Sequence, residues 1–184
     1  MNFSTTEAAT DLGGLTRSIT EAVCTPERQR ELDGLDERFD RDLWRKLVDA
    51  DILTTTAPES LGGGGFGVLE EVAVLVALGR QLAAVPYLES VVLGVGALAK
   101  FGSDTLAQEW AVPALAGEKI ITVARDGEMG EGPVRASSNA AEYRLTGTRT
   151  QIAYAQSADA FRVSAETVPA SAFSSSPVVT TVSR

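Results

Sequence analysis

The sequence contains no histidine and a single cysteine, Cys24, among its 184 residues. Without histidine the chain lacks the commonest general base, the Ser-His-Asp triad and ordinary zinc catalysis. One cysteine excludes an intrachain disulfide and a cysteine-based metal cluster, and predicts a small, half-buried side chain. Any acid-base chemistry must therefore come from a carboxylate, a tyrosine, a lysine or a bound cofactor.

Basic residues are also scarce, with 16 Lys and Arg against 25 Asp and Glu and a net charge of -9. Such a chain repels a phosphate backbone and has no basic stripe to bind one, so we expect no nucleic-acid binding. No run approaches the ~20 apolar residues of a membrane span, and the N-terminus lacks the features of a secretory signal. We therefore expect a soluble, cytoplasmic protein with no membrane span.

Helical patterns occupy the first 117 residues. Apolar residues recur at three- and four-residue steps, and Asp40 precedes one such run as a candidate N-cap. The run that begins at Val68 has almost no polar side, which predicts a helix buried on all sides at the centre of a helical domain. Pro113 predicts a kink or an early end in the last helix. The expected helices cover residues 3–23, 40–51, 68–82, 88–101 and 105–115, with a charged connector between the first two.

Short β-type segments follow residue 117. Helices followed by strands indicate an α+β fold, with an all-helical domain at residues 1–117 and a partial antiparallel β domain at residues 118–184. Three or four strands are too few for a self-contained barrel, so we expect the β domain to be incomplete. The expected strands are 119–124, 142–146, 148–154 and 160–165, with a loop at 126–139 and a strand fragment or frayed tail at 166–184.

A glycine tract separates the second and third expected helices. Gly62-x-Gly64-x-x-Gly67 has the letters of a dinucleotide-binding fingerprint, but residues 58–60 separate the glycines from any preceding strand. A second parallel strand does not follow, and no Gly-Lys-Ser/Thr completes a phosphate-binding P-loop. We interpret the tract as a structural turn that uses positive φ angles, with nucleotide binding as the weaker alternative.

Four groups of motifs follow one another along the chain. They are Leu43-Trp44-x-x-Leu47, Pro58-Glu59-x-x-Gly62-Gly63-x-Gly65 with Leu78-Gly79-Arg80, Phe101-Gly102-Ser103 with Trp110-x-x-Pro113-x-Leu115-Ala116-Gly117-Glu118, and Tyr143-x-Leu145-x-Gly147-x-Arg149 with Ala158-Asp159-Ala160-Phe161. In this order they resemble the motifs of the acyl-CoA dehydrogenase family. The resemblance runs from about residue 3 to residue 165 and covers the N-terminal helical domain and part of the middle β domain. No counterpart of the family's C-terminal helical bundle is expected in this sequence.

The resemblance implies a flavin enzyme that uses FAD to desaturate the α,β bond of an acyl-CoA thioester. In such enzymes a carboxylate removes the α proton, the flavin takes the β hydride, and an electron-transfer acceptor reoxidises the flavin. The family's carboxylate lies in the C-terminal bundle, so the resemblance assigns no catalytic residue to this sequence.

The resemblance places the flavin contacts in two short segments. The first supplies Val123, Ala124 and Asp126, after the first β segment. The second supplies Gln151, Ile152 and Ala153. Gln151 stands where the family has an aromatic residue and Ala153 where it has a hydroxyl, so a plain sheet surface remains the alternative for this segment.

Two functions follow from the resemblance. In the first, the chain is part of an acyl-CoA dehydrogenase and supplies the floor of the acyl pocket and one wall of the flavin site. In the second, it is a non-catalytic structural subunit with an eroded flavin site, as in actinobacterial members, steroid side-chain dehydrogenases among them, that pair unlike subunits. Both imply an oligomer with itself or with another acyl-CoA dehydrogenase chain, because helices of this domain otherwise leave an apolar face open.

Overall fold

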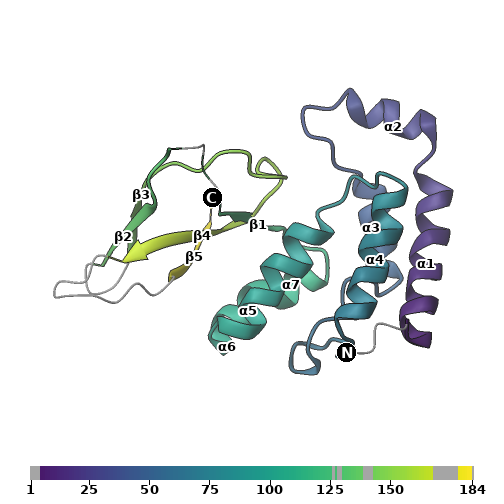
Figure 1. Cartoon of the computed structure of the whole chain (residues 1–184), viewed down its shortest axis with the longest axis horizontal. Helices are drawn as coiled ribbons and strands as arrows, with labels where there is room; N and C mark the ends of the chain where they lie inside the picture. Colours follow the sequence, from purple (N-terminus) through teal and green to yellow (C-terminus); the bar gives the residue numbers. More distant parts are fainter. Residues whose placement is uncertain (1–4, 126, 128–129, 139–142, 168–177, 184) are drawn as a thin grey trace.

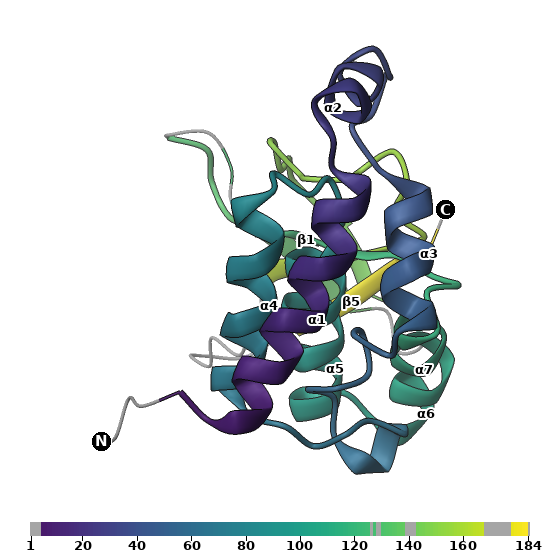
Figure 2. The same cartoon turned by 90° about the vertical axis from the view of Figure 1, so that its right-hand side faces the viewer.

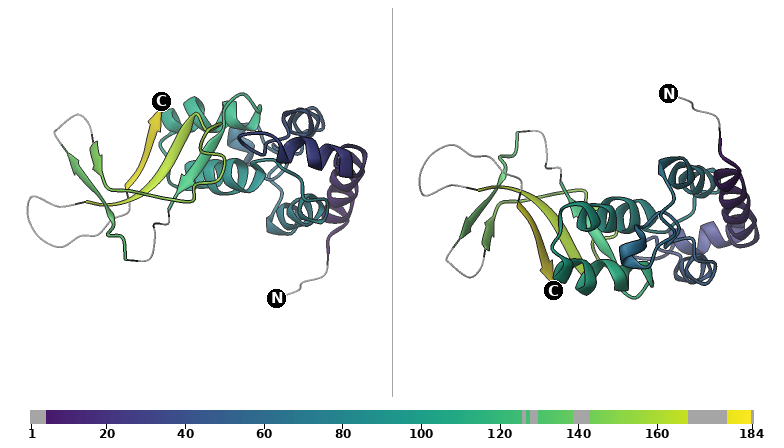
Figure 3. Two further views of the ribbon diagram at one scale, coloured as in Figure 1. Left: turned by 90° about the horizontal axis from the view of Figure 1, so that it is seen from above. Right: turned by 90° about the horizontal axis from the view of Figure 1, so that it is seen from below.

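The computed structural model describes residues 5–125, 127, 130–138, 143–167 and 178–183. Helices occupy one end of the molecule and a small sheet the other, which confirms the α+β fold class (Figure 1). The helices of residues 87–115 lie between the sheet and the layer of α1, α3 and α4 (Figure 3). The helical elements are α1 (Glu7–Val23), α2 (Pro26–Asp33), α3 (Arg41–Asp49), η1 (Glu59–Leu61), α4 (Val68–Arg80), η2 (Tyr87–Val95), α5 (Gly96–Phe101), α6 (Asp104–Leu106), η3 (Ala107–Ala111) and α7 (Val112–Leu115).

All five expected helical segments are confirmed, and α2 is an additional helix in the expected connector. The side chain of Thr25 accepts a hydrogen bond from the Arg28 amide, and Pro26 follows in the first turn, so α2 has a favourable start. The sequence did not predict α2, because a mostly charged helix with little apolar surface gives a weak periodic signal. Of the two outcomes expected at Pro113, a kink or an early end, the early end does not occur: a π-helical stretch, η3, precedes the proline, and the chain stays helical to Leu115.

The expectation that the Val68 helix is buried on all sides is also wrong. Val74 in α4 is fully buried, but the side chains of Val68, Val72 and Val76 are 69%, 48% and 47% exposed. Helix α1 packs along one side of α4 (Figure 2), where the Cβ of Ala73 would lie 3.3 Å from a Cβ at Gly13. Apolar periodicity cannot distinguish a face that packs within the chain from one that is left open.

The sheet has the strand order β1-β4-β2-β3, and β5 also pairs with β4. Strand β1 pairs with residues 160–163 of β4 and β2 with residues 165–167, whereas β5 pairs with residues 160–165. Strand β4 runs parallel to β1 and β2, whereas the pairs β2–β3 and β4–β5 are antiparallel. The sheet is therefore mixed, and the expected antiparallel arrangement describes half of its pairings. The strands are β1 (Ile121–Ala124), β2 (Val134–Ser138), β3 (Tyr143–Thr146), β4 (Ala160–Thr167) and β5 (Val178–Ser183).

Two local expectations in the β part are wrong. Strand β2 lies inside the expected loop at residues 126–139, where Val134 and Ala136 are buried and Arg135 is exposed between them. The expected strand at residues 148–154 is instead a turn, because Gln151 and Tyr154 both have a φ of 55°. That left-handed conformation is incompatible with a strand.

The glycine tract is a structural turn, as predicted. Gly62 has a φ of 79°, and a Cβ at Gly63 would lie 2.1 Å from the carbonyl oxygen of Ala57. The amides of residues 63–66 donate hydrogen bonds to the carbonyls of residues 54–58. These amides are therefore already used by the backbone and leave no open cradle for a phosphate.

The helical part and the first strand share one core. Ile121 of β1 donates its amide hydrogen to Oγ of buried Ser90 in η2, at 3.1 Å. The side chain of Ile121 lies so near η2 that a Cβ at Gly94 would be 3.0 Å from it. Arg162 of β4 adds a hydrogen bond to the carbonyl of Leu93, at 2.8 Å. These contacts fix the start of the sheet against the helices.

Candidate functional site

The turn between β3 and β4 brings the two segments of the expected flavin site together. The hydroxyl of Thr122, a buried residue of β1, donates a hydrogen bond to the carbonyl of Ala153 at 2.6 Å. Val123 and Ala124, which follow Thr122, therefore lie beside the turn that carries Gln151 and Ile152. Asp126, the remaining expected contact, lies outside the described residues.

The exposure of these side chains shows which of them suit a flavin ring. Ala124 is buried, and Val123 and Ile152 are partly buried. Gln151 and Ala153 are exposed. Neither offers an aromatic face or a hydroxyl donor. The described residues thus include apolar side chains but lack the stacking and hydrogen-bonding groups that the resemblance implies.

An apolar cleft of about 330 Å³ lies next to this turn, and Tyr154 forms part of its lining. The cleft opens between the end of α4 and the start of η2. We call it the apolar cleft and define it by Arg38, Leu75, Leu78, Gly79, Leu82, Ala83, Val85, Tyr87, Leu88, Glu89 and Tyr154. A mostly apolar concavity with a few polar groups is typical of a binding site for an apolar ligand.

Three ionisable groups in the apolar cleft, Tyr87, Glu89 and Tyr154, have raised pKa values. Burial raises the pKa of Tyr87 to about 12. Burial raises the pKa of the Glu89 carboxyl. Burial, with a contribution from the charge of Glu89, raises the pKa of Tyr154 to about 12. Ionisable groups shifted by burial in a cleft are candidates for a functional site. The sequence analysis did not select Glu89, although a lone carboxylate in the apolar run of η2 was a usable signal.

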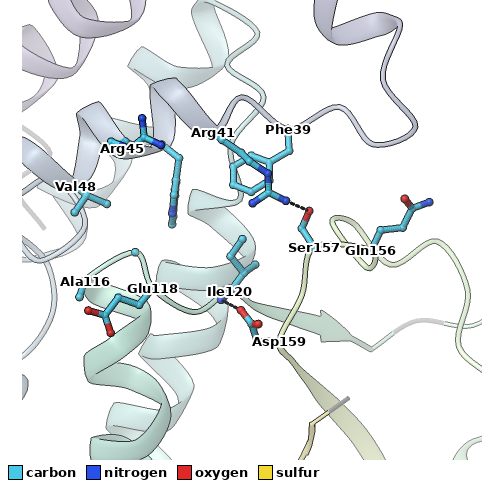
Figure 4. Close-up of a pocket in the computed structure, with 12 residues that line it drawn as sticks. Phe39, Arg41, Arg45, Val48, Ala116, Glu118, Ile120, Gln156, Ser157 and Asp159 are labelled. Atoms are coloured by element: carbon cyan, nitrogen blue, oxygen red, sulfur yellow. Dashed lines mark hydrogen bonds between the residues drawn. The ribbon is translucent and has the colours of Figure 1, made fainter.

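A second, more polar cleft of about 500 Å³ lies where α3 meets the turn and the start of β1 (Figure 4). Arg41 of α3 donates a hydrogen bond to Oγ of Ser157 at 3.0 Å. The Ile120 amide donates to Oδ2 of Asp159 at 2.8 Å. Both bonds are drawn in Figure 4, and they join the helical part to the turn and to β4.

Two absences hold for the described part of the chain. It contains no group of three or more His, Cys, Asp or Glu residues that could hold a metal ion. It also contains no helix that is both long enough and apolar enough to cross a membrane.

The helical domain leads into the β domain at a Gly-Glu junction, and the apolar cleft lies beside the turn between β3 and β4. This arrangement is that of the acyl-CoA dehydrogenase class. Residues 6–118 match the family model described as the acyl-CoA dehydrogenase N-terminal domain. This match covers more than half of the chain. The chain belongs to the acyl-CoA dehydrogenase family.

Individual relatives agree with this assignment. The chain is 70% identical over 167 residues to acyl-CoA dehydrogenase FadE27 of Mycobacterium tuberculosis, which is 91% of this chain and 45% of that protein. A chain in the ChsE4-ChsE5 complex from the same species is similar in structure, with a TM-score of 0.92, 66% identity, and coverage of 100% of this chain and 49% of that chain.

A variant of the Tcur3481-Tcur3483 steroid ACAD is a further structural relative, with a TM-score of 0.81 and 28% identity. The match covers 88% of this chain and 45% of that one. The present chain therefore spans about half the length of these relatives.

Proposed function

We propose that this chain is part of a cytoplasmic, flavin-dependent acyl-CoA dehydrogenase that desaturates the α,β bond of a fatty or steroid side-chain acyl-CoA thioester. The observation that supports the proposal is the Thr122 to Ala153 hydrogen bond, which joins β1 to the turn at residues 151–154. Tyr154, the next residue, lines the apolar cleft, so the proposed acyl-binding and flavin-binding surfaces would adjoin.

The residues of this chain supply only part of such a site. Val123, Ala124 and Ile152 would contact one edge of FAD, which supplies the acceptor for the β hydride. Gln151 and Ala153 provide neither stacking nor a hydroxyl donor. We assign no described carboxylate to removal of the α proton. The proposed enzyme therefore needs further residues, from a partner chain or from additional sequence, and an electron-transfer acceptor.

A non-catalytic role is the second candidate, and the exposed side chains of Gln151 and Ala153 favour it. In this case the chain is the structural subunit of a heteromeric acyl-CoA dehydrogenase, and the flavin is held elsewhere. Two of the structural relatives, ChsE4-ChsE5 and Tcur3481-Tcur3483, pair two differently named proteins, which supports a hetero-oligomeric assembly.

Visible flavin absorbance tests the proposal. We expect the isolated chain to be colourless after purification, and flavin to copurify when it is coexpressed with a suitable acyl-CoA dehydrogenase partner. If Ile152 contacts the flavin, Ile152→Glu in that complex should lower the flavin content at least tenfold. Thr148→Glu, an exposed position in the same segment, should leave it unchanged.

The outcomes separate the two candidates. A yellow isolated chain would contradict the need for further residues. Full flavin content in the Ile152→Glu complex would favour the structural subunit, because that role requires no contact between Ile152 and the flavin.

The open face of α4 predicts self-association of the isolated chain. Val68, Val72 and Val76 lie along one side of the helix and are exposed, and apolar surface of this kind marks an interface. We expect oligomers at micromolar concentration in sedimentation velocity. The double variant Val72→Glu, Val76→Glu should raise the dissociation constant at least about tenfold, because the oligomer would lose the favourable burial of two valine side chains at its interface.

Phe101→Glu is the control for this prediction, since Phe101 is 71% exposed but lies at the end of α5, on a different helix. It should leave the association unchanged. A monomeric wild-type chain at micromolar concentration would show that the α4 face is not an interface.

A further inference from the structure

The loop between α2 and α3 binds the turn between β3 and β4 through one carboxylate. Oε1 of Glu37 accepts a hydrogen bond from the Gln156 amide at 3.1 Å. Oε2 of Glu37 accepts a hydrogen bond from the hydroxyl of Ser157. Arg41 donates to the same Ser157 oxygen at 3.0 Å. These contacts join residues about 120 positions apart in the sequence.

Two aromatic rings extend the same contact toward the apolar cleft. The rings of Phe39 and Tyr154 meet edge to face, with centroids 5.8 Å apart and an interplanar angle of 79°. The guanidinium of Arg41 lies 4.6 Å from the centroid of Phe39 on its ring face. Phe39 is buried in the main core, so it gives Tyr154 a fixed surface to pack against.

The turn held in this way has an unfavourable backbone. Gln151 and Tyr154 both adopt a φ of 55°, a region that bulky residues other than glycine rarely occupy. Such a conformation persists only where surrounding contacts impose it, and it is found preferentially at functional sites. The contacts of Glu37 with residues 156 and 157 lie two and three positions beyond Tyr154, close enough to impose it.

We propose that Glu37 is a positioning residue that, by binding Gln156 and Ser157, holds Tyr154 in place as one wall of the apolar cleft. Glu37 itself is not part of the lining of the apolar cleft and lines a separate cleft with Gln156 and Ser157. The helical domain thereby sets the shape of the cleft through the same turn that carries Gln151–Ala153. The role of the cleft in binding an acyl group rests on the proposed function, whereas the positioning of Tyr154 does not.

Fluorine NMR of the full chain labelled with 3-fluorotyrosine tests this proposal. The sequence has three tyrosines, so three resonances are expected, and Tyr154→Phe assigns one of them. Glu37→Ala should shift and broaden the Tyr154 resonance while that of Tyr143, in β3, stays in place. Glu37→Gln, which keeps one oxygen acceptor, should produce a smaller change.

Asp36→Asn is the matched control, because it removes the same charge from the neighbouring, exposed position. It should leave all three resonances unchanged. An unchanged Tyr154 resonance in both Glu37 variants, or an equal change in Asp36→Asn, would overturn the proposal. If Glu37→Ala does not fold, the Glu37→Gln spectrum decides.

Titration with octanoyl-CoA separates this proposal from the proposed function. We expect the Tyr154 resonance of the wild-type chain to respond, and Glu37→Ala to bind about tenfold more weakly because the wall is no longer held. A wild-type chain that does not respond would contradict acyl binding in the cleft. The ligand-free spectra would still decide whether Glu37 positions Tyr154.

Discussion

Replacing Asp40 by alanine should lower the free energy of unfolding by about 3 kcal/mol. The side chain of Asp40 is 1% exposed, and its Oδ1 and Oδ2 accept hydrogen bonds from Arg28 at 2.8 and 3.0 Å. Oδ1 also accepts from the Leu43 amide at 3.1 Å and so caps α3. The variant loses a buried charged pair and a helix cap together, whereas Arg28 is itself partly exposed and can be hydrated.

Urea unfolding followed by the fluorescence of the two tryptophans, at constant slope m, measures this loss. Asp40→Asn keeps the cap but not the charge, so it should lose about half as much. Asp42→Ala is the control: Asp42 is exposed and lies 3.4 Å from Arg28, so its removal should cost less than about 0.5 kcal/mol. Equal losses in the Asp40 and Asp42 variants would contradict the assignment.

The contribution of Asp40 should also depend on pH. Burial by itself would raise the pKa of Asp40, but hydrogen bonds from Arg28 and the Leu43 amide, with the charge of Arg28, hold this pKa below its ordinary value. A carboxyl with a lowered folded-state pKa stabilises the fold above its unfolded pKa, about 3.9 for aspartate. The difference between wild type and Asp40→Ala should stay constant near neutral pH and shrink as pH falls below about 4.

Replacing Gly117 by alanine should cost a similar amount, about 3 kcal/mol. Gly117 has a φ of 73° and ends α7: its amide donates to the Ala114 carbonyl, and the Glu118 amide donates to that of Pro113. This is the Schellman pattern, in which an L-residue is strained. A Cβ here would also lie 2.5 Å from Cγ2 of Val48 and 3.3 Å from Nε1 of Trp44.

The same unfolding measurement tests this expectation. Gly79→Ala is the control, because Gly79 is helical and a Cβ there would meet nothing within 4 Å. That variant should be neutral or more stable by about 0.5–1 kcal/mol. Unchanged stability in Gly117→Ala would show that the junction between α7 and β1 relaxes freely around an added methyl group.

Local chemistry was enough to predict most of the helical part, although it missed α2 and the open face of α4. Asp40 was expected to cap α3 and does so, because an N-cap is decided by a few neighbouring residues. The glycine tract was expected to be a turn, and the amides of residues 63–66 are satisfied by nearby carbonyls. The alternating residues from Ala160 onward form β4. For the cap and the glycine turn, the contacts that decide the structure lie close by in the sequence.

The candidate site was predicted less completely. The motifs placed flavin contacts near Val123 and Gln151, and the Thr122 hydrogen bond joins these two segments. The apolar cleft was expected only as a general acyl pocket, without Glu89 or Arg38. Its lining combines the end of α4, the start of η2 and a turn some 70 residues later. No local sequence pattern predicts that these segments meet.

The sequence by itself determined the helices other than α2, the Asp40 cap, the glycine turn and the family, because these depend on short-range hydrogen bonding, backbone preference and motifs in order. The tertiary structure decided the rest: the open face of α4, the parallel pairing of β4 with β1 and β2, and the turn at Gln151–Tyr154. An alternating segment such as residues 148–154 suits a strand equally well by its local pattern. Contacts from distant residues, Glu37 and Phe39 among them, outweigh that preference and form the turn.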